Sequence, residues 1–195
     1  TGKTTLARIL SREFGADYFE LSAISSGVKK VREIIAKGKV ALQIGKRSIL
    51  FIDEIHCFSK SQQNTLLHAV EDGSIILMGA TTENPSFEVI RPLLSRCQVL
   101  RLHPLDNNEL AEILSRAVKE DILLSRRRLN MDKTVMSLIT KSCGGDARKM
   151  LNTVELAISM ISENDSNVTV DYIQEALQQR QVIYDKDGDY HYDVI

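Results

Sequence analysis

Two short runs in this sequence carry residue types suited to phosphate chemistry. Gly-Lys-Thr stands at positions 2–4, and the acidic pair Asp53-Glu54 follows an apolar run. Gly-Lys-Thr ends the phosphate-binding loop pattern G-x-x-x-x-G-K-[ST], but the first glycine and three of the four spacer residues of that pattern are not in the sequence. Alone, the run also fits an ordinary helix start with a lysine nearby.

The acidic pair ends the segment "SILFIDE" (48–54), whose four consecutive apolar residues predict a strand buried on both faces. Ligands of open α/β sheets bind at the carboxyl ends of strands, and phosphoryl transfer needs a carboxylate for Mg²⁺ and a group that orients water. A solvated acidic pair at a strand end is the alternative. The two runs together favour phosphate chemistry.

This interpretation assigns a role to each group. Backbone N–H groups of Gly2, Lys3 and Thr4 point at phosphate from a helix start, and Lys3 neutralises the β and γ phosphates of ATP. The Thr4 hydroxyl and Asp53 hold Mg²⁺, and Glu54 polarises the attacking water. The residues predicted to bind nucleotide at this end of the chain are Thr1, Gly2, Lys3, Thr4 and Thr5.

Strands and helices alternate up to residue 102, as in an α/β domain with a mostly parallel sheet. The expected helices are 3–14, with Leu6, Ile9 and Leu10 on its apolar face, 25–38, ended by Gly38, 59–73, and a helical piece over 86–96 broken near Pro92. The expected strands are 17–21, 48–54, 74–82 and 97–102.

After Pro104 only helical patterns follow. Their expected ranges are 106–121, 132–142, 146–162 and 170–178. We therefore predict an α/β domain over 1–102, an all-α domain over 103–180, and over 181–195 a tail or the start of a truncated region. The basic run at 125–129 is interpreted as a solvated loop, with contact to nucleic acid as the less favoured alternative.

Composition excludes several classes of protein. The 25 lysines and arginines nearly balance 26 aspartates and glutamates, so any nucleic-acid-binding surface is local. Three widely spaced cysteines suit a reducing compartment, and no apolar run approaches the ~20 residues that cross a bilayer. We expect a cytoplasmic protein without membrane contact. His56 beside Cys57 lacks metal-ligand partners at useful spacing, so no zinc site is predicted.

Four segments in this order resemble the AAA+ ATPases of the clamp-loader clade: "LFIDEIHCFSKSQQNTLL", "GATTENPSF", "LLSRCQV" and "GGDARKMLN". Within that clade the chain is most similar to the replication-associated recombination protein A family, whose eukaryotic counterpart is the Werner-helicase-interacting ATPase. "GATTENPSF" and the tail "YDKDGDYHYDVI", which resembles the family's entry into an oligomerisation region, separate it from related families. Cys57 stands where the family commonly has arginine, which puts in doubt any DNA or subunit contact of that arginine.

The resemblance implies three further site residues. Thr82 resembles the sensor-1 polar group, with Asn84 as the less favoured candidate for that role. Arg96 resembles the arginine finger that reaches the nucleotide of the adjacent subunit, and Arg148 the sensor-2 arginine of the lid. Each residue also has a structural interpretation. In that interpretation Thr82 only caps a strand, and Arg96 only forms a surface salt bridge worth under ~1 kcal/mol. The positive charge of Arg148 then only balances the negative charge of Asp146.

The fold implied by the resemblance is an AAA+ P-loop NTPase sheet flanked by helices and followed by an all-α lid. The implied function is ATP hydrolysis by a homo-oligomer that maintains replication forks and takes part in recombination and repair. Expected partners are single-stranded, gapped or forked DNA, single-stranded DNA-binding protein and the replication machinery, with nucleoid association in a bacterium. The alternatives are a clamp-loader subunit, a Holliday-junction branch-migration ATPase and a non-hydrolysing scaffold subunit.

Overall fold

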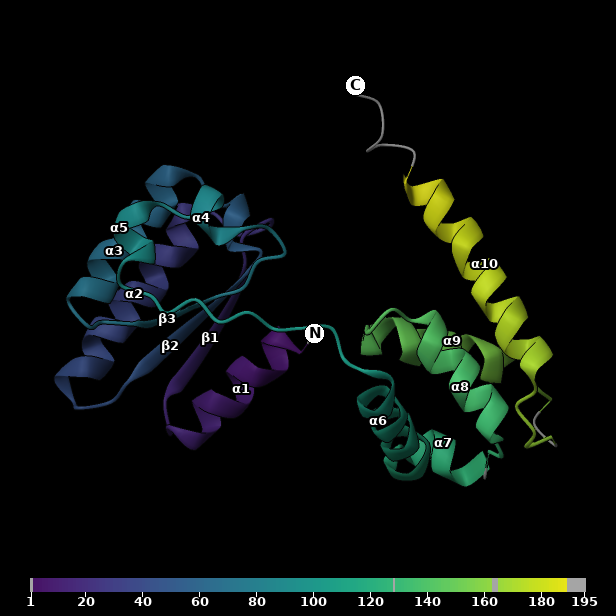
Figure 1. Ribbon diagram of the computed structural model, residues 1–195. Helices are drawn as coiled ribbons and strands as arrows, with labels where there is room; N and C mark the ends of the chain where they lie inside the picture. Colours follow the sequence, from purple (N-terminus) through teal and green to yellow (C-terminus); the bar gives the residue numbers. More distant parts are fainter. Residues whose placement is uncertain (1, 128, 163–164, 189–195) are drawn as a thin grey trace, which may run out of the picture. The chain divides into compact units, whose positions relative to one another are not determined.

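A computed structural model describes residues 2–127, 129–162 and 165–188 of the chain. Contacts divide the chain into two compact units, one of residues 2–102 and one that begins at His103 (Figure 1). We propose these units as the two domains of the chain. Among the described residues, no helix combines the length and the apolar character needed to cross a membrane.

The first unit contains a parallel sheet of three strands in the order β1-β2-β3. The strands are β1 (Asp17–Ser22), β2 (Ser48–Asp53) and β3 (Ile76–Gly79). In the register of the sheet, Ser22 lies beside Asp53 and Ile52 lies beside both Leu21 and Gly79. The carboxyl ends of all three strands therefore meet at one edge, which confirms the predicted parallel α/β sheet.

Helices cover both faces of the central strand β2. Their bounds are Lys3–Glu13 (α1), Val28–Gln43 (α2) and Lys60–Glu71 (α3). In the core, Leu50 and Ile52 pack in the cluster that includes Val31 of α2 and Leu66 of α3. Phe51, between them in sequence, packs instead with Ala7 of α1. Alternation along the strand thus fills both layers, as the continuous apolar run predicts.

The face of α1 that packs on the sheet differs from the prediction. Leu6 and Ile9 are exposed, whereas Ala7 and Ser11 are the buried residues of the helix. The small side chains let α1 lie close over the aromatic ring of Phe51, with which Ala7 packs. The spacing of the large apolar residues therefore identified the wrong face.

The prediction that Gly38 ends a helix was wrong. Gly38 lies buried inside α2. An ideal Cβ atom at this position would overlap the backbone carbonyl oxygen of Ser74. The glycine therefore permits close approach of α2 to the segment that precedes β3. The serines predicted to cap α2 also do not cap it, because the N-cap is Gly27, with no side-chain cap.

The predicted strand over 97–102 is absent, and this segment has no regular secondary structure. Val99 and Leu100 are 56% and 69% exposed. A strand requires hydrogen bonds to a neighbour, and among the described residues β3 pairs only with β2. The preceding segment forms two short helices, α4 (Pro85–Glu88) and α5 (Arg91–Leu94), and Pro92 lies in the first turn of α5 rather than at the break.

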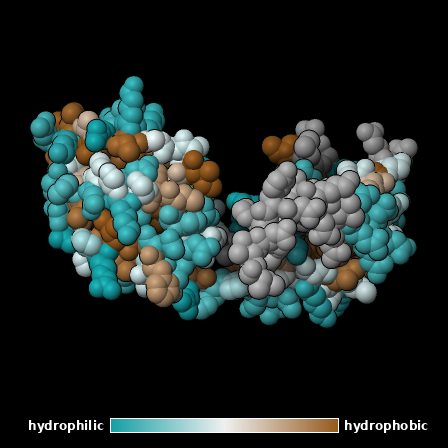
Figure 2. All heavy atoms as spheres, turned by 90° about the horizontal axis from the view of Figure 1, so that it is seen from above, coloured by the Kyte–Doolittle hydropathy of each residue, from teal (hydrophilic) through white to brown (hydrophobic). Residues whose placement is uncertain are grey.

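Apolar side chains are exposed at several places on the surface, for example Phe14, Ile24, Ile44, Phe87 and Ile122. In Figure 2 the hydrophobic groups of the unit of residues 2–102 appear as several separate brown areas among hydrophilic atoms. Apolar side chains scattered in this way are normal on a protein surface.

The second unit is built from helices, as predicted. They are α6 (Asn107–Glu120), α7 (Ile122–Arg127), α8 (Lys133–Ser142), α9 (Ala147–Met160) and α10 (Val170–Gly188). Asp106, Asp132 and Asp146 are the N-caps of α6, α8 and α9, and the side chain of each accepts backbone N–H groups of the first turn. A single core cluster includes Leu110 of α6, Ile139 of α8 and other buried apolar residues.

Two predictions in this unit were wrong. Helix α10 does not end at residue 178 but continues to Gly188, through part of the segment predicted to be a tail or the start of a truncated region, whose residues 189–195 lie outside the described residues. The basic run at 125–129 is not simply a solvated loop, because α7 extends to Arg127. Arg127 donates hydrogen bonds of 3.0–3.1 Å to the carbonyl groups of Ile158, Ile161 and Ser162, at and just after the C-terminal end of α9.

Replacement of Arg127 by methionine is expected to lower the stability of the helical unit by ~2 kcal/mol, because hydrogen bonds from a charged group contribute about 1.5–3 kcal/mol. Thermal unfolding measures the change. The matched control is Arg116→Met on α6, whose side chain forms an exposed ion pair with Glu120 and should change stability by less than ~0.5 kcal/mol. Equal effects of the two substitutions would show that the carbonyl contacts of Arg127 do not stabilise the unit.

Candidate nucleotide-binding and hydrolysis site

The N-terminus of α1 presents unpaired backbone donors. Gly2 precedes the helix with φ 72° and ψ 13°, in the left-handed region, and a Cβ atom there would meet open space. The first hydrogen bond of the helix runs from the Leu6 N–H to the Gly2 carbonyl. The N–H groups of Lys3, Thr4 and Thr5 therefore have no acceptor within the helix, and the helix dipole favours an anion at this end. Thr1 lies outside the described residues.

The second part of the site is the turn that follows β2. Asp53 is the last residue of the strand, half-buried, and Glu54 adopts φ 51°. Among the described residues, Glu54 is the only non-glycine residue with positive φ. Such a conformation costs roughly 1–3 kcal/mol and is found preferentially at functional sites. The positive φ of Glu54 turns the chain from β2 into the short helix η1 (Ile55–Cys57). The N–H of Ile55, the first residue of η1, donates a hydrogen bond to the Ala80 carbonyl.

The Glu54 carboxylate contacts the segment after β3. The backbone N–H of Thr82 lies 3.4 Å from Glu54 Oε2, and the Thr82 hydroxyl lies 3.3 Å from the same oxygen. His56 Nδ1 approaches it to 3.2 Å. The side chains of Glu54 and His56 are 25% and 22% exposed, so both are largely shielded from solvent.

Lys3 joins the three elements into one site, because its ammonium group donates a 3.2 Å hydrogen bond to the carbonyl of Thr81. The start of α1, the end of β2 and the segment after β3 thus bring together Lys3, Glu54 and Thr82, which belong to separate motifs of the sequence. Asp53 at the end of β2 and Thr4 in the first turn of α1 contribute a carboxylate and a hydroxyl, which are oxygen donors of the kind that Mg²⁺ binds, while its other positions are kept for phosphate and water.

Arg96 makes local contacts in this structure. Its guanidinium group forms an ion pair with Glu71 of α3 at 2.6 Å and donates hydrogen bonds to the Pro92 carbonyl and to Ser95 Oγ. Within the described residues it has no contact with Lys3 or Glu54. The structure therefore shows the salt bridge that was the alternative interpretation of Arg96, and its action on a neighbouring subunit remains a prediction.

Arg148 lies in the first turn of α9 in the helical unit, and its side chain is exposed. The backbone N–H groups of Lys149 and Arg148 donate to Asp146 and are the main causes that lower the pKa of that carboxyl group, with the charge of Arg148 a smaller cause. The backbone of Arg148 thus takes part in the helix cap. Its sensor-2 role remains a prediction.

Two residues of the site, His56 and Thr81, were not predicted from the sequence. The structure places the His56 ring nitrogen Nδ1 2.8 Å from Thr81 Oγ1, next to the Glu54 carboxylate. The only local signal was the position of His56 two residues after Glu54. The contact itself depends on the pairing of β3 with β2, which spacing along the chain does not reveal.

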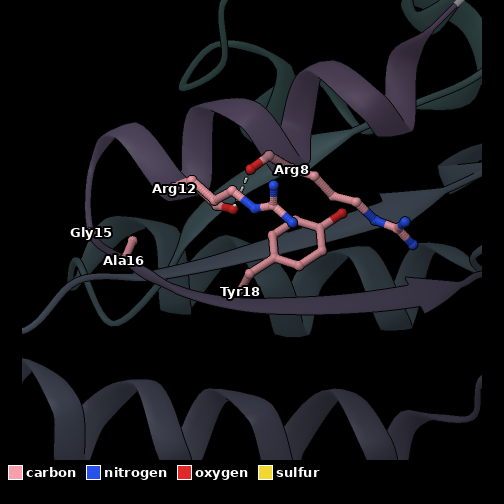
Figure 3. A pocket seen from close by; sticks show the side chains of 6 residues that line it. Arg8, Arg12, Gly15, Ala16 and Tyr18 are labelled. Carbon is pink, nitrogen blue, oxygen red and sulfur yellow. Dashed lines mark hydrogen bonds between the residues drawn. The ribbon is translucent and has the colours of Figure 1, made fainter. Parts of the chain in front are cut away.

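A hollow of about 430 Å³ lies near the opposite end of α1. Figure 3 shows the side chains of Arg8 and Arg12 extending over Tyr18 beside this hollow. Arg8 already forms a 2.8 Å ion pair with Glu20, which raises the pKa of Arg8 through its hydrogen bond and its charge. The C-terminal end of a helix also carries partial negative charge. This end of α1 is therefore less suited to phosphate than its N-terminus.

Comparison with known proteins agrees with this geometry. The family model described as "ATPase family associated with various cellular activities (AAA)" matches residues 1–105, and a second model, the AAA C-terminal domain, matches residues 125–195. A solved structure of a RuvB mutant from Thermotoga maritima superposes with a TM-score of 0.69 at 25% identity, covering 91% of this chain and 58% of that one.

Relatives match over the whole chain. Replication-associated recombination protein A is 40% identical in both Haemophilus influenzae and Escherichia coli K12, and ATPase WRNIP1 of Dictyostelium discoideum is 41% identical. The chain spans 44% of the length of the two bacterial relatives and 24% of the third. The resemblance inferred from the four motifs is confirmed. The chain belongs to the AAA family of ATPases.

Proposed function

We propose that this chain is the ATP-hydrolysing module of an oligomeric protein that acts on DNA in replication-associated recombination and repair. The proposal rests on two contacts with one segment. Lys3 donates a hydrogen bond to Thr81, and the next residue, Thr82, donates to Glu54. A phosphate-binding cation and a carboxylate that can accept a proton from water then face the same substrate. The similarity to replication-associated recombination protein A supports the biological role.

In the proposed reaction, the N–H groups at the start of α1 and the ammonium group of Lys3 hold the phosphates of ATP. The Thr4 hydroxyl and Asp53 would hold Mg²⁺, and the ion would supply positive charge against the charge that develops on the phosphate oxygens. Glu54 orients the attacking water and accepts its proton. Thr82 donates to the Glu54 carboxylate and responds to the terminal phosphate as sensor 1.

Arg96 and Arg148 complete the proposed machinery. In a homo-oligomer, Arg96 exchanges its ion pair with Glu71 for the terminal phosphate bound by the adjacent subunit. Its planar guanidinium group suits phosphate oxygens in the transition state. Arg148 contacts the nucleotide of its own subunit. Residues 181–195 then lead into the oligomerisation region.

The proposed partner is single-stranded, gapped or forked DNA, together with single-stranded DNA-binding protein and the replication machinery, which in a bacterium places the protein at the nucleoid. The test is the rate of ATP turnover by the full-length protein with no DNA, with each of these DNAs and with a four-way junction. Turnover several-fold higher on forked or gapped DNA supports the proposal. Equal turnover in all cases contradicts the DNA role.

The second candidate function is branch migration at a Holliday junction, which the structural likeness to RuvB favours. It predicts the highest turnover on the four-way junction in the same assay. A clamp-loader subunit remains a weaker alternative, because the segment "GATTENPSF" resembles the recombination family instead. A non-hydrolysing scaffold subunit is disfavoured by the presence of Lys3, Thr4 and Glu54 in one chain.

A further inference from the structure

One oxygen of the Glu54 carboxylate receives all the contacts recorded for that group. Oε2 lies within 3.2–3.4 Å of three nitrogen or oxygen atoms, which are the backbone nitrogen of Thr82, the hydroxyl of Thr82 and Nδ1 of His56. Among the described residues, Oε1 receives none of these hydrogen bonds. The two carboxylate oxygens therefore have different surroundings, and Oε1 is the one available to a water molecule.

The ring of His56 is itself fixed by Thr81. The Thr81 hydroxyl oxygen accepts the backbone N–H of Glu83 at 3.0 Å and lies 2.8 Å from His56 Nδ1. Nδ1 thus lies near two oxygen atoms, Thr81 Oγ1 and Glu54 Oε2, and because a carboxylate oxygen only accepts hydrogen bonds, an attractive contact with Glu54 requires the proton on Nδ1. The Thr81 carbonyl at the same time accepts from Lys3, so one residue contacts both the phosphate-binding lysine and the histidine.

We propose that His56 is a positioning residue for ATP hydrolysis, whose Nδ1 proton is shared between Thr81 Oγ1 and Glu54 Oε2 and holds the carboxylate so that Oε1 faces the attacking water. The Thr81 hydroxyl fixes the ring through the same nitrogen, Nδ1, that approaches Glu54. The inference rests on the proposed role of Glu54 as the proton acceptor. Fixing a glutamate side chain costs conformational entropy, because the side chain loses rotamer freedom. Partners that are themselves held in place fix the side chain before the substrate binds.

The backbone strain at Glu54 makes the contact between His56 and the Glu54 carboxylate important. A left-handed backbone at a non-glycine residue persists only when its surroundings fix it, and here Thr82 and His56 hold the side chain while Ile55 anchors the following turn. The limited exposure of both side chains strengthens the attraction between Glu54 Oε2 and the donors around it, because a polar contact shielded from water is electrostatically stronger.

The test compares His56→Leu with His56→Asn in the full-length protein. Asparagine can place an amide N–H close to the position of Nδ1, whereas leucine removes the donor at similar size. We expect His56→Leu to lower kcat by about 10-fold to 100-fold, while KM and the affinity for a non-hydrolysable ATP analogue change by less than about 3-fold. His56→Asn should recover most of kcat. Thr81→Val and Thr81→Ser form a second pair, in which only valine should lower kcat.

A double substitution separates the two layers of the proposal. On the Glu54→Gln background, His56→Leu should cause no further loss of kcat, because His56 acts through the carboxylate. Wild-type kcat in both His56→Leu and Thr81→Val, alongside an inactive Glu54→Gln, would overturn the role of His56 and leave the proposed function standing. A higher kcat in His56→Leu would also overturn it, by showing that the contact restrains Glu54. Full turnover by Glu54→Gln would instead remove the proposed function.

Discussion

Glu54→Gln in the full-length protein is expected to lower ATP turnover by about 10²-fold or more while ATP binds almost as well as to wild type. The amide has the shape of the carboxylate, and its oxygen can still accept hydrogen bonds from Thr82 and keep the contact with His56, so the turn after β2 keeps its structure. What it loses is the ability to accept a proton from water, and a positioned base contributes about 10²–10⁴-fold to rate. Steady-state turnover and calorimetric titration with a non-hydrolysable ATP analogue measure the two effects.

The matched control is Glu112→Gln, which makes the same chemical change at an exposed position of α6. It should turn over ATP at the wild-type rate. Wild-type turnover by Glu54→Gln would remove Glu54 from the reaction, whatever its contacts with Thr82.

Arg96→Ala should be almost inactive in the full-length protein, with a loss on the order of 10³-fold or more, the range seen when an arginine finger is removed in related phosphoryl transfer. If Arg96 acts on the neighbouring subunit, a mixture of Arg96→Ala with Lys3→Ala should regain part of the turnover. At a shared interface, one mutant supplies an intact phosphate site and the other supplies the arginine. Turnover of each mutant alone and of the mixture measures this rescue.

Arg91→Ala is the control for the second prediction, because Arg91 is an exposed arginine that begins the helix just before Arg96. It should retain wild-type turnover. Native mass spectrometry of the mixture establishes that mixed oligomers form. If they form and no turnover returns, Arg96 acts within its own subunit or only through its ion pair with Glu71.

Local patterns predicted the parts of the fold that depend on nearby residues. The continuous apolar run of β2 required burial on both faces, and Leu50 and Phe51 fill opposite layers. Asp106 begins α6 because its short carboxylate accepts the N–H groups of the first turn. Ser59 begins α3 in the same way, with Gln62 completing a capping box.

The features that sequence did not predict depend on contacts between distant segments. Gly38 is the kind of residue that often ends a helix. It is required here because a Cβ atom would overlap the carbonyl oxygen of Ser74, which lies in another segment. Arg127 belongs to a basic run, and its partners lie more than 30 residues further along the chain. The segment 97–102 has the composition of a strand, but among the described residues it has no partner strand.

The candidate site divides in the same way. The types of Lys3 and Glu54 and their places at a helix start and a strand end were readable from sequence, and the structure brings both residues against the segment after β3. His56 and Thr81 were not predicted, because their contact arises from the parallel pairing of two strands whose carboxyl ends meet. The trans action of Arg96 requires a second subunit, and no pattern within one chain determines it.

The central claim, that the N-terminus of α1 binds the phosphates of ATP, is tested most directly by calorimetric titration of the full-length protein with a non-hydrolysable ATP analogue. The two variants to compare are Lys3→Ala, at the N-terminus of α1, and Arg12→Ala, beside the hollow near its other end. We predict that Lys3→Ala loses at least ~100-fold in affinity, or ~2.7 kcal/mol, and that Arg12→Ala binds like wild type. Unchanged affinity in Lys3→Ala, or a comparable loss in Arg12→Ala, would contradict the claim.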